Sequence, residues 1–215
     1  MAERYVITLG RECGAGATYI AQHLSKELGI PYYDKDIFRM VSDKSGVLEE
    51  FFHVNSERPG NNLLYKLVKD LKPADQKPSL GKDIVSPDNL FRFQSELIRE
   101  LADNESCIII GRCADYVLKD HDNCVHVFVC GDMDSKVQRM MHSYSLEESA
   151  AVERIKETDK QRKKYYSYYT GGDWEAASNY DLCLNTGDMS IEEAAEQILF
   201  YLKQKKIGRA SCRER

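Results

Sequence analysis

The chain has 215 residues, of which 42% are hydrophobic and 30% are charged, a balance typical of one globular α/β domain. Its formal net charge of −5 argues against a broad surface for nucleic acid or an anionic membrane, so any basic site must be local. No apolar run approaches the roughly 20 residues that span a bilayer, and the first residues, MAERYVITL, lack the form of a signal peptide. We therefore expect a cytoplasmic protein.

The first elements are a short apolar strand at residues 5–9 and an amphipathic helix at residues 17–28, which Gly29 ends. The stretch IPYYDKDIFRM predicts a brief second strand followed by another helix. Residues 55–86 are rich in proline and polar residues, so we expect loops and short helices there.

Regular structure returns with a helix that Ser86 caps and Pro87 begins. Its apolar stripe consists of Leu90, Phe93, Leu97 and Leu101. The runs CIIIG and VHVFVC then predict two buried strands, and a helix at residues 133–144 follows the second.

The C-terminal third predicts two more helices and one more strand. A long helix runs from about residue 146 to 166, with a capping box from Ser145 to Glu148. DLCLN is the last strand, and Ser190 with Glu193 caps the final helix. Strands that alternate with helices predict a parallel sheet with helices on both faces.

The seven cysteines include no CxxC pair. Cys107, Cys130 and Cys183 fall in apolar runs, so we expect buried thiols and no metal site. Cys13 and Cys113 differ because each belongs to a loop that could form a site.

The stretch ITLGRECGAGATYIAQHL has the form of a strand that turns through a glycine loop into a helix. Such a loop directs backbone N–H groups at a phosphate, while a lysine balances its charge and a Ser or Thr ligates magnesium. Gly14, Gly16 and Thr18 are suitably spaced, but Arg11 stands at the first glycine of GxxxxGK[ST] and Ala17 stands at the lysine. The alternative is a simple glycine turn between a strand and a helix.

Two further segments carry candidate cations. CIIIGRCADYVL delivers Gly111 and Arg112 at the carboxyl end of a strand, where open α/β sheets bind ligands. The alternative for Arg112 is an ordinary surface arginine. ERIKETDKQRKKYYSYYTGGDW is a basic helix that ends in tyrosines and two glycines, as a lid could, although a charge run is more simply a solvated face. Its cations are Lys156, Lys160, Arg162, Lys163 and Lys164.

Together and in this order, the three segments resemble the cytidylate kinase-like family, a branch of the P-loop nucleoside monophosphate kinases. The resemblance covers essentially residues 4–203. It implies a P-loop NTPase-type parallel sheet covered by helices on both faces, with a helical lid at about residues 145–175 and a nucleotide-monophosphate region at about residues 52–86.

The resemblance carries Gly14, Ala15, Gly16 and Thr18 onto the family's GPSGAGKGT loop, from which Ala17 departs at the lysine. Gly111 and Arg112 match the family's Gly-Arg-Asp motif, but Cys113 replaces its aspartate. Of the family's lid arginines, Arg162 matches in type and Lys160 in charge, and Asp34 resembles the aspartate after the second strand.

Two functions remain open at this stage. The first is transfer of the γ-phosphate of ATP to a nucleoside monophosphate, with CMP or dCMP favoured by the resemblance. The second is a nucleotide-binding sensor that has lost catalysis, which the missing lysine and aspartate favour. Both use small-molecule nucleotides and neither uses a nucleic acid or a membrane; the sequence assigns no oligomeric state.

The residues expected in the site follow from these segments. ATP phosphates are assigned to Cys13, Gly14, Ala15, Gly16, Ala17 and Thr18, magnesium to Thr18, catalysis to Arg11, Arg112, Lys160 and Arg162, and the acceptor to Asp34, Arg39 and Arg112. Arg11 is further expected to replace part of the absent lysine's charge, unless it points outward or pairs with a carboxylate.

The last nine residues, IGRASCRER, break the pattern of the preceding helix and resemble the translation of a sequencing adapter. We interpret residues 207–215 as a non-native tail and residues 1–206 as a single kinase-like domain.

Overall fold

In the computed structural model, residues 4–46 and 86–205 are described, and five parallel strands form one sheet within them. The strand order is β2-β3-β1-β4-β5, and each neighbouring pair is parallel. The strands are β1 (Val6–Arg11), β2 (Tyr32–Tyr33), β3 (Cys107–Ile110), β4 (Cys124–Cys130) and β5 (Leu182–Asn185). The predicted parallel sheet is confirmed.

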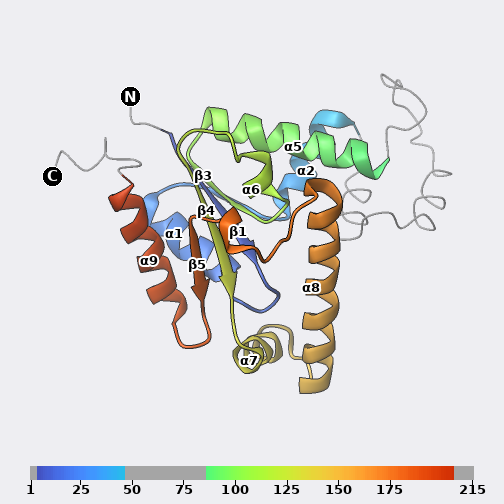
Figure 1. Ribbon diagram of the computed structural model, residues 1–215, viewed down its shortest axis with the longest axis vertical. Coiled ribbons are helices and arrows are strands. Elements are labelled where there is room, and N and C mark those ends of the chain that lie inside the picture. The colour runs from blue at the N-terminus through green and yellow to red at the C-terminus, as the bar shows by residue number, and fades with distance from the viewer. Residues whose placement is uncertain (1–3, 47–85, 206–215) are drawn as a thin grey trace.

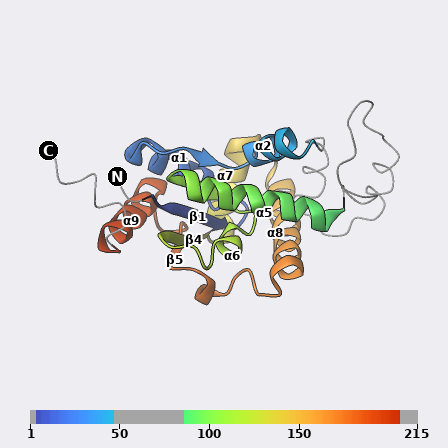
Figure 2. The same cartoon turned by 90° about the horizontal axis from the view of Figure 1, so that it is seen from above.

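Helices cover both faces of this sheet (Figure 1). They are α1 (Ala17–Leu28), α2 (Asp36–Ser45), α5 (Pro87–Asn104), α6 (Ala114–Val117), α7 (Met133–Tyr144), α8 (Glu148–Thr170) and α9 (Ile191–Gln204), and a 3-10 turn spans Ala177–Asn179. The view from above in Figure 2 shows α5 crossing over the sheet, with α8 and α9 at opposite ends of the molecule.

The central strand β1 is buried on both faces, which explains its continuous apolar sequence. Ile7 and Leu9 pack in the core with α1 and α9. Val6 belongs to the core on the opposite face, formed with α2, α5 and α6. These two cores place helices on both sides of the sheet.

The strand register places the end of β1 beside the ends of its two neighbours. Leu9 pairs with Ile110 of β3, and Arg11 pairs with Val129 of β4. The chain leaves β1 at a point where the strands on either side belong to later parts of the sequence. Such a switch point, at the carboxyl ends of parallel strands, is where open α/β sheets bind ligands.

Three of the predicted helix ends are confirmed. Gly29 ends α1 in the left-handed conformation with a φ of 66°, and the Ser86 side chain accepts the Asn89 N–H at 3.2 Å. The full capping box of Ser190 and Glu193 begins α9. Local sequence signals therefore determine these ends.

The capping box predicted at Ser145 is wrong. Ser145 has a φ of 52° and ends α7, while Glu147 is the N-cap of α8 without a side-chain capping bond. An N-cap side chain works from extended backbone, which the tight turn between these two helices does not provide at Ser145. The helix also continues four residues past the predicted end, to Thr170.

The six described cysteines are free thiols, and four of them are buried. Cys183, which we expected to be buried, is exposed, because β5 lies at the edge of the sheet and alternates its side chains between core and solvent. Cys130 is only partly buried. The tail at residues 207–215 and all but the last residue of the 52–86 region lie outside the described residues.

No helix in the described part of the chain is both long enough and apolar enough to cross a membrane.

Candidate functional site

The glycine loop joins the end of β1 to the start of α1. Gly14 and Gly16 have φ values of 80° and 88°, in the left-handed region that favours glycine. A side chain at Gly14 would also meet the backbone of Lys136 at 2.9 Å, and one at Gly16 would collide with Ile191. Backbone conformation therefore favours glycine at both positions, and close packing against backbone also requires it at Gly14.

A cavity of about 520 Å³ lies over this loop and the N-terminus of α1. Its lining includes five arginines and a lysine but only two carboxylates: Arg11, Arg112, Arg139, Arg154, Arg162 and Lys35, against Glu12 and Asp34. In a chain of net charge −5, this is the local basic site that the composition left possible. Its excess of positive charge suits a ligand that carries phosphate groups.

Asp34 lies between two of these arginines, which come from the ends of neighbouring strands. Its carboxylate is 3.7 Å from the Arg11 guanidinium and 3.9 Å from the Arg112 guanidinium. The Arg112 guanidinium also lies over the Phe38 ring, 3.9 Å from the ring centre. The Arg11 side chain passes so close to Gly111 that a side chain there would overlap it.

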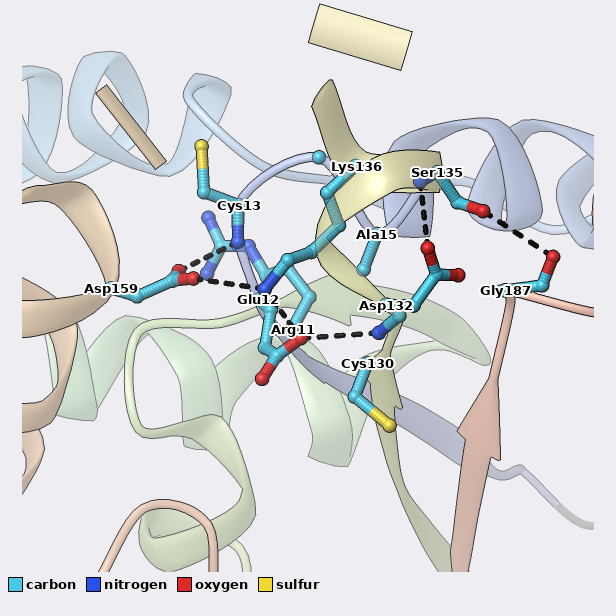
Figure 3. A network of polar contacts seen from close by, with 12 residues as sticks. Arg11, Glu12, Cys13, Ala15, Cys130, Asp132, Ser135, Lys136, Asp159 and Gly187 are labelled. Atoms are coloured by element: carbon cyan, nitrogen blue, oxygen red, sulfur yellow. Dashed lines mark hydrogen bonds and ion pairs between the residues drawn. The ribbon is translucent and has the colours of Figure 1, made fainter. Parts of the chain in front are cut away.

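The loop is also held by a buried ion network from α7 and α8 (Figure 3). Lys136 Nζ donates to Glu12 Oε2 at 2.9 Å and lies 3.6 Å from Asp159 Oδ2. The other oxygen of Asp159 accepts the Cys13 N–H at 2.7 Å. Burial raises the pKa of Asp159, against the opposing effect of the Cys13 N–H and the neighbouring cations.

Arg139 fixes the far side of the loop. It donates to the carbonyl oxygen of Gly14 at 3.1 Å and to that of Thr186. The Thr186 hydroxyl in turn donates to the Ala15 carbonyl oxygen at 2.9 Å. Hydrogen bonds from Arg139 on α7 and from Thr186 after β5 thus hold the loop on two sides. They keep the backbone N–H groups of the loop arranged to bind an anion.

Helix α8 presents a different face to the cavity from the one that its lysines suggested. Lys160 is exposed and does not line the cavity, and Lys156, Lys163 and Lys164 are also exposed. The solvated-face alternative therefore describes the positions of these lysines. Arg154, Thr158 and Arg162 are the α8 residues in the cavity lining.

The other expected residues divide between the cavity and its surroundings. Arg39 on α2 is exposed and is not in the lining, whereas Asp34 is. Ala15 is fully buried beneath the loop. All the remaining expected residues line the cavity: Arg11, Cys13, Gly14, Gly16, Ala17, Thr18, Arg112 and Arg162.

A smaller cavity of about 30 Å³ adjoins Arg11, Arg112 and Arg162. It is walled by aromatic residues, and Tyr166 donates to the buried Asp115 carboxylate at 2.7 Å. Burial raises the pKa of Asp115 and raises that of Cys113 well above its ordinary value. Cys113 is also only 5% exposed, so we expect this thiol to stay protonated at neutral pH.

The residues available to a magnesium ion are few. Thr18 is exposed in the first turn of α1 and lines the cavity. Elsewhere in the described ranges, no group of three or more His, Cys, Asp or Glu side chains could hold a metal ion. Magnesium keeps several waters and takes few protein ligands, and a Ser or Thr hydroxyl at the start of a phosphate-loop helix can be one of them, so the position of Thr18 suits this role.

Sequence reasoning missed Lys136, Arg139, Arg154, Thr158 and Asp159. For the three α8 residues a signal existed, since the buried positions Ala151 and Ile155 fix which face of the helix points inward. For Lys136 and Arg139 the sequence held no such signal, because their role depends on how α7 packs beneath the loop.

Among curated relatives, the chain is 24% identical over 199 residues to a cytidylate kinase of Methanobrevibacter smithii, covering 92% of this chain and 98% of the relative. It is 26% identical over 198 residues to a cytidylate kinase of Methanopyrus kandleri, covering 87% and 88%.

Solved structures give the same fold. An uncharacterized protein from Eubacterium ventriosum matches with a TM-score of 0.66 and 26% identity, covering 93% of this chain and 99% of that one. A shikimate kinase from Acinetobacter baumannii matches with a TM-score of 0.51 and 14% identity, covering 95% and 96%, and shows the shared P-loop kinase fold. The family model described as the cytidylate kinase-like family matches residues 6–188, and the chain belongs to that family.

Proposed function

We propose that the protein transfers the γ-phosphate of ATP to a nucleoside monophosphate, with CMP or dCMP as the acceptor. The observation that carries this proposal is a single cavity that joins two anion-binding features. One is the glycine loop with the start of α1, and the other is the pair Arg11 and Arg112 on either side of Asp34. Phosphoryl transfer needs both a donor and an acceptor phosphate held in one water-poor space.

Each side of the cavity has a distinct task in this proposal. The amides from Gly14 to Thr18 hold the ATP phosphates, with the Thr18 hydroxyl on magnesium. Arg112 and Asp34 bind the acceptor, while Arg11 and Arg162 neutralise charge on the transferred group, the main demand of this chemistry. Lys160 and Arg39 stay predictions of lesser weight, because both side chains are exposed to solvent and lie outside the cavity lining.

The choice of acceptor follows the family and the names of its curated relatives, which are cytidylate kinases. At 24% and 26% identity those names support a cytosine nucleotide as the first acceptor to test. We also propose that the protein acts in the cytoplasm on small-molecule nucleotides, without a nucleic-acid or membrane partner.

A second function is favoured by one observation: Ala17 stands where the loops of related kinases carry a lysine. In this alternative the protein binds nucleotides as a sensor and does not transfer phosphate.

A coupled assay for ADP release, run with ATP, magnesium and a panel of nucleoside monophosphates, separates the two functions. The kinase proposal predicts turnover with CMP or dCMP above the other acceptors. Arg112→Met should lower kcat/KM for the acceptor by at least about tenfold, or about 1.4 kcal/mol. Arg99→Met, which removes an exposed arginine from α5, should not.

Binding measurements complete the comparison. ATP binding without ADP release for any acceptor would leave the sensor function and contradict the kinase. No thermal stabilisation by millimolar ATP would contradict both, because a ligand that binds the native state must stabilise it.

A further inference from the structure

The glycine loop lacks its own lysine, but a buried lysine reaches it from another helix. Lys136 lies in the first turn of α7 and is 6% exposed. Its backbone and Cβ pack against Gly14, and its Nζ ends at Glu12, 2.9 Å away (Figure 3). Burying an ammonium group is costly unless it is paired, so this placement of a lysine calls for a function or a strong partner.

Glu12 holds Lys136 from one side. The same oxygen of Glu12 also accepts the backbone N–H of Gly131 at 3.1 Å, so the carboxylate is fixed in position by two donors. Glu12 is itself a residue of the loop. Lys136 and Asp159 lie beside the cavity and not in its lining, so the pairing with Glu12, which does line it, ties the ammonium group of Lys136 to the phosphate-binding segment.

The other partner of Lys136 is a carboxylate from α8. Asp159 accepts the Cys13 N–H with one oxygen at 2.7 Å and lies 3.6 Å from Lys136 with the other. Arg162 is 3.9 Å from the same carboxylate. An amide of the glycine loop, a lysine and an arginine thus converge on one anionic group, and these are the donor types that bind phosphate in proteins.

We propose that Lys136 is the cation of the phosphate loop, in place of a lysine at position 17, and that the Asp159 carboxylate occupies a nucleotide phosphate's position on Cys13 and Lys136 until nucleotide binds. This inference rests on the proposed binding of nucleotide phosphates at the glycine loop.

The charges support such an exchange. With Arg162, which lies 3.9 Å from Asp159, the two carboxylates Glu12 and Asp159 are balanced by two cations. Removing the Asp159 carboxylate leaves one excess positive charge for a phosphate. When a phosphate takes the place of Asp159, Glu12 still fixes Lys136, and the phosphate presents two oxygens to the donors that the carboxylate had bridged. Displacing Asp159 also returns a partly buried carboxylate to water, which offsets part of the cost of breaking its bonds.

The test uses inorganic pyrophosphate as the ligand and titration calorimetry as the measurement. Lys136→Met alone would leave Glu12 without its cation and Asp159 with only Arg162, which endangers folding. The informative pair is therefore Asp159→Asn, which keeps an oxygen acceptor for Cys13 but removes the competing charge, and the double variant Lys136→Met/Asp159→Asn. The double variant removes one charge of each sign.

A matched control lies between the exposed side of α8 and the turn that follows this helix. Lys163 and Asp173 form an exposed ion pair at 3.6 Å, and Lys163→Met/Asp173→Asn repeats the same chemical change away from the loop. Thermal unfolding of each variant reports folding separately from binding.

Asp159→Asn should bind pyrophosphate at least about threefold tighter than the unaltered protein, because a charged competitor is gone. The double variant should bind at least about tenfold more weakly than Asp159→Asn, or about 1.4 kcal/mol, because the cation is gone. The control should match the unaltered protein.

Weaker binding by Asp159→Asn, or equal binding by Asp159→Asn and the double variant, would overturn this inference while leaving the proposed function in place. An unaltered protein that binds neither pyrophosphate nor ATP would instead overturn the proposed function, and this inference with it.

Discussion

Replacing Arg11 by Met tests whether the residue at the loop entrance supplies part of the charge that phosphate binding needs. The Met side chain keeps most of the apolar stem and removes the guanidinium, which is the part of Arg11 that lies against Gly111. The structure places that guanidinium in the cavity lining and also 3.7 Å from Asp34. The alternative expected from the sequence, a pairing with a carboxylate, therefore describes Arg11, and its compensating role stays a prediction.

The expected magnitude follows from this shared position. Two charges about 4 Å apart near a protein surface interact by roughly 4 kcal/mol before desolvation is subtracted. Exposed pairs retain about 0–1 kcal/mol and buried interfacial pairs about 2–5 kcal/mol. The Arg11 side chain is 15% exposed, and Arg112 also pairs with Asp34, so Arg11 lies between the exposed and the buried case. We therefore expect Arg11→Met to lose at least about 1.4 kcal/mol of ATP binding, or tenfold in affinity.

Calorimetry with ATP and magnesium measures this loss, and Arg112→Met is the matched comparison because it removes the other guanidinium beside Asp34. Arg112→Met should weaken the acceptor more than ATP. Arg11→Lys should recover only part of the affinity, since an ammonium lacks the planar fork of the guanidinium. Unchanged ATP affinity and unchanged turnover in Arg11→Met would refute the compensating role.

Three further outcomes are expected. Burial lowers the pKa of His126 from its ordinary value of 6.5, so below about pH 6.5 the unfolded chain takes up a proton before the folded protein does. The free energy of unfolding should therefore fall on acidification below about pH 6.5, and less so in His126→Gln, as urea unfolding would show. Ser190→Ala should cost about 1 kcal/mol by removing a capping box, whereas Ser145→Ala should stay within about 0.5 kcal/mol; equal costs would contradict the assigned caps. Deleting residues 207–215 should change the melting temperature and ATP binding little, and a loss above about 1 kcal/mol would show that the tail belongs to the fold.

Much of the fold could be predicted because its signals are local. Glycine after α1, serine before α5 and the Ser190–Glu193 pair each act within one turn of a helix. The wrong predictions concern features that depend on residues far apart in the sequence but close in space. The apolar run containing Cys183 does not reveal that its strand lies at a sheet edge, and the turn at Ser145 is set by how α7 packs on α8.

The candidate site shows the same difference between residues that the local sequence predicts and residues whose position depends on packing. Arg11 and Arg112 lie where strands end, and parallel strands bring their carboxyl ends together, so the sequence could predict that both lie at this edge of the sheet, where both line the cavity. Lys160 was chosen by charge without regard to helical phase. Thr158 and Arg162 lie three and seven residues after the buried Ile155, on the inward side, whereas Lys160 lies five residues after it and faces solvent.

Position 17, where the loop lacks a lysine, is better understood as a packing position than as the place of a lost functional group. Ala17 is 3% exposed and packs in the core with α9. Gly16→Val, a natural test of the loop, would be ambiguous, because a β-branched side chain at a φ of 88° would strain the loop before any phosphate bound. Ala17→Lys should therefore destabilise the fold by about 1–3 kcal/mol through overpacking, and more where its charge stays buried. Thr18→Lys, one residue further on and exposed, should cost much less in the same melting experiment. An Ala17→Lys protein that kept its stability and bound ATP more tightly would show that the loop is a degraded lysine loop, which would weaken the case for Lys136 and Arg11 and strengthen that for a sensor.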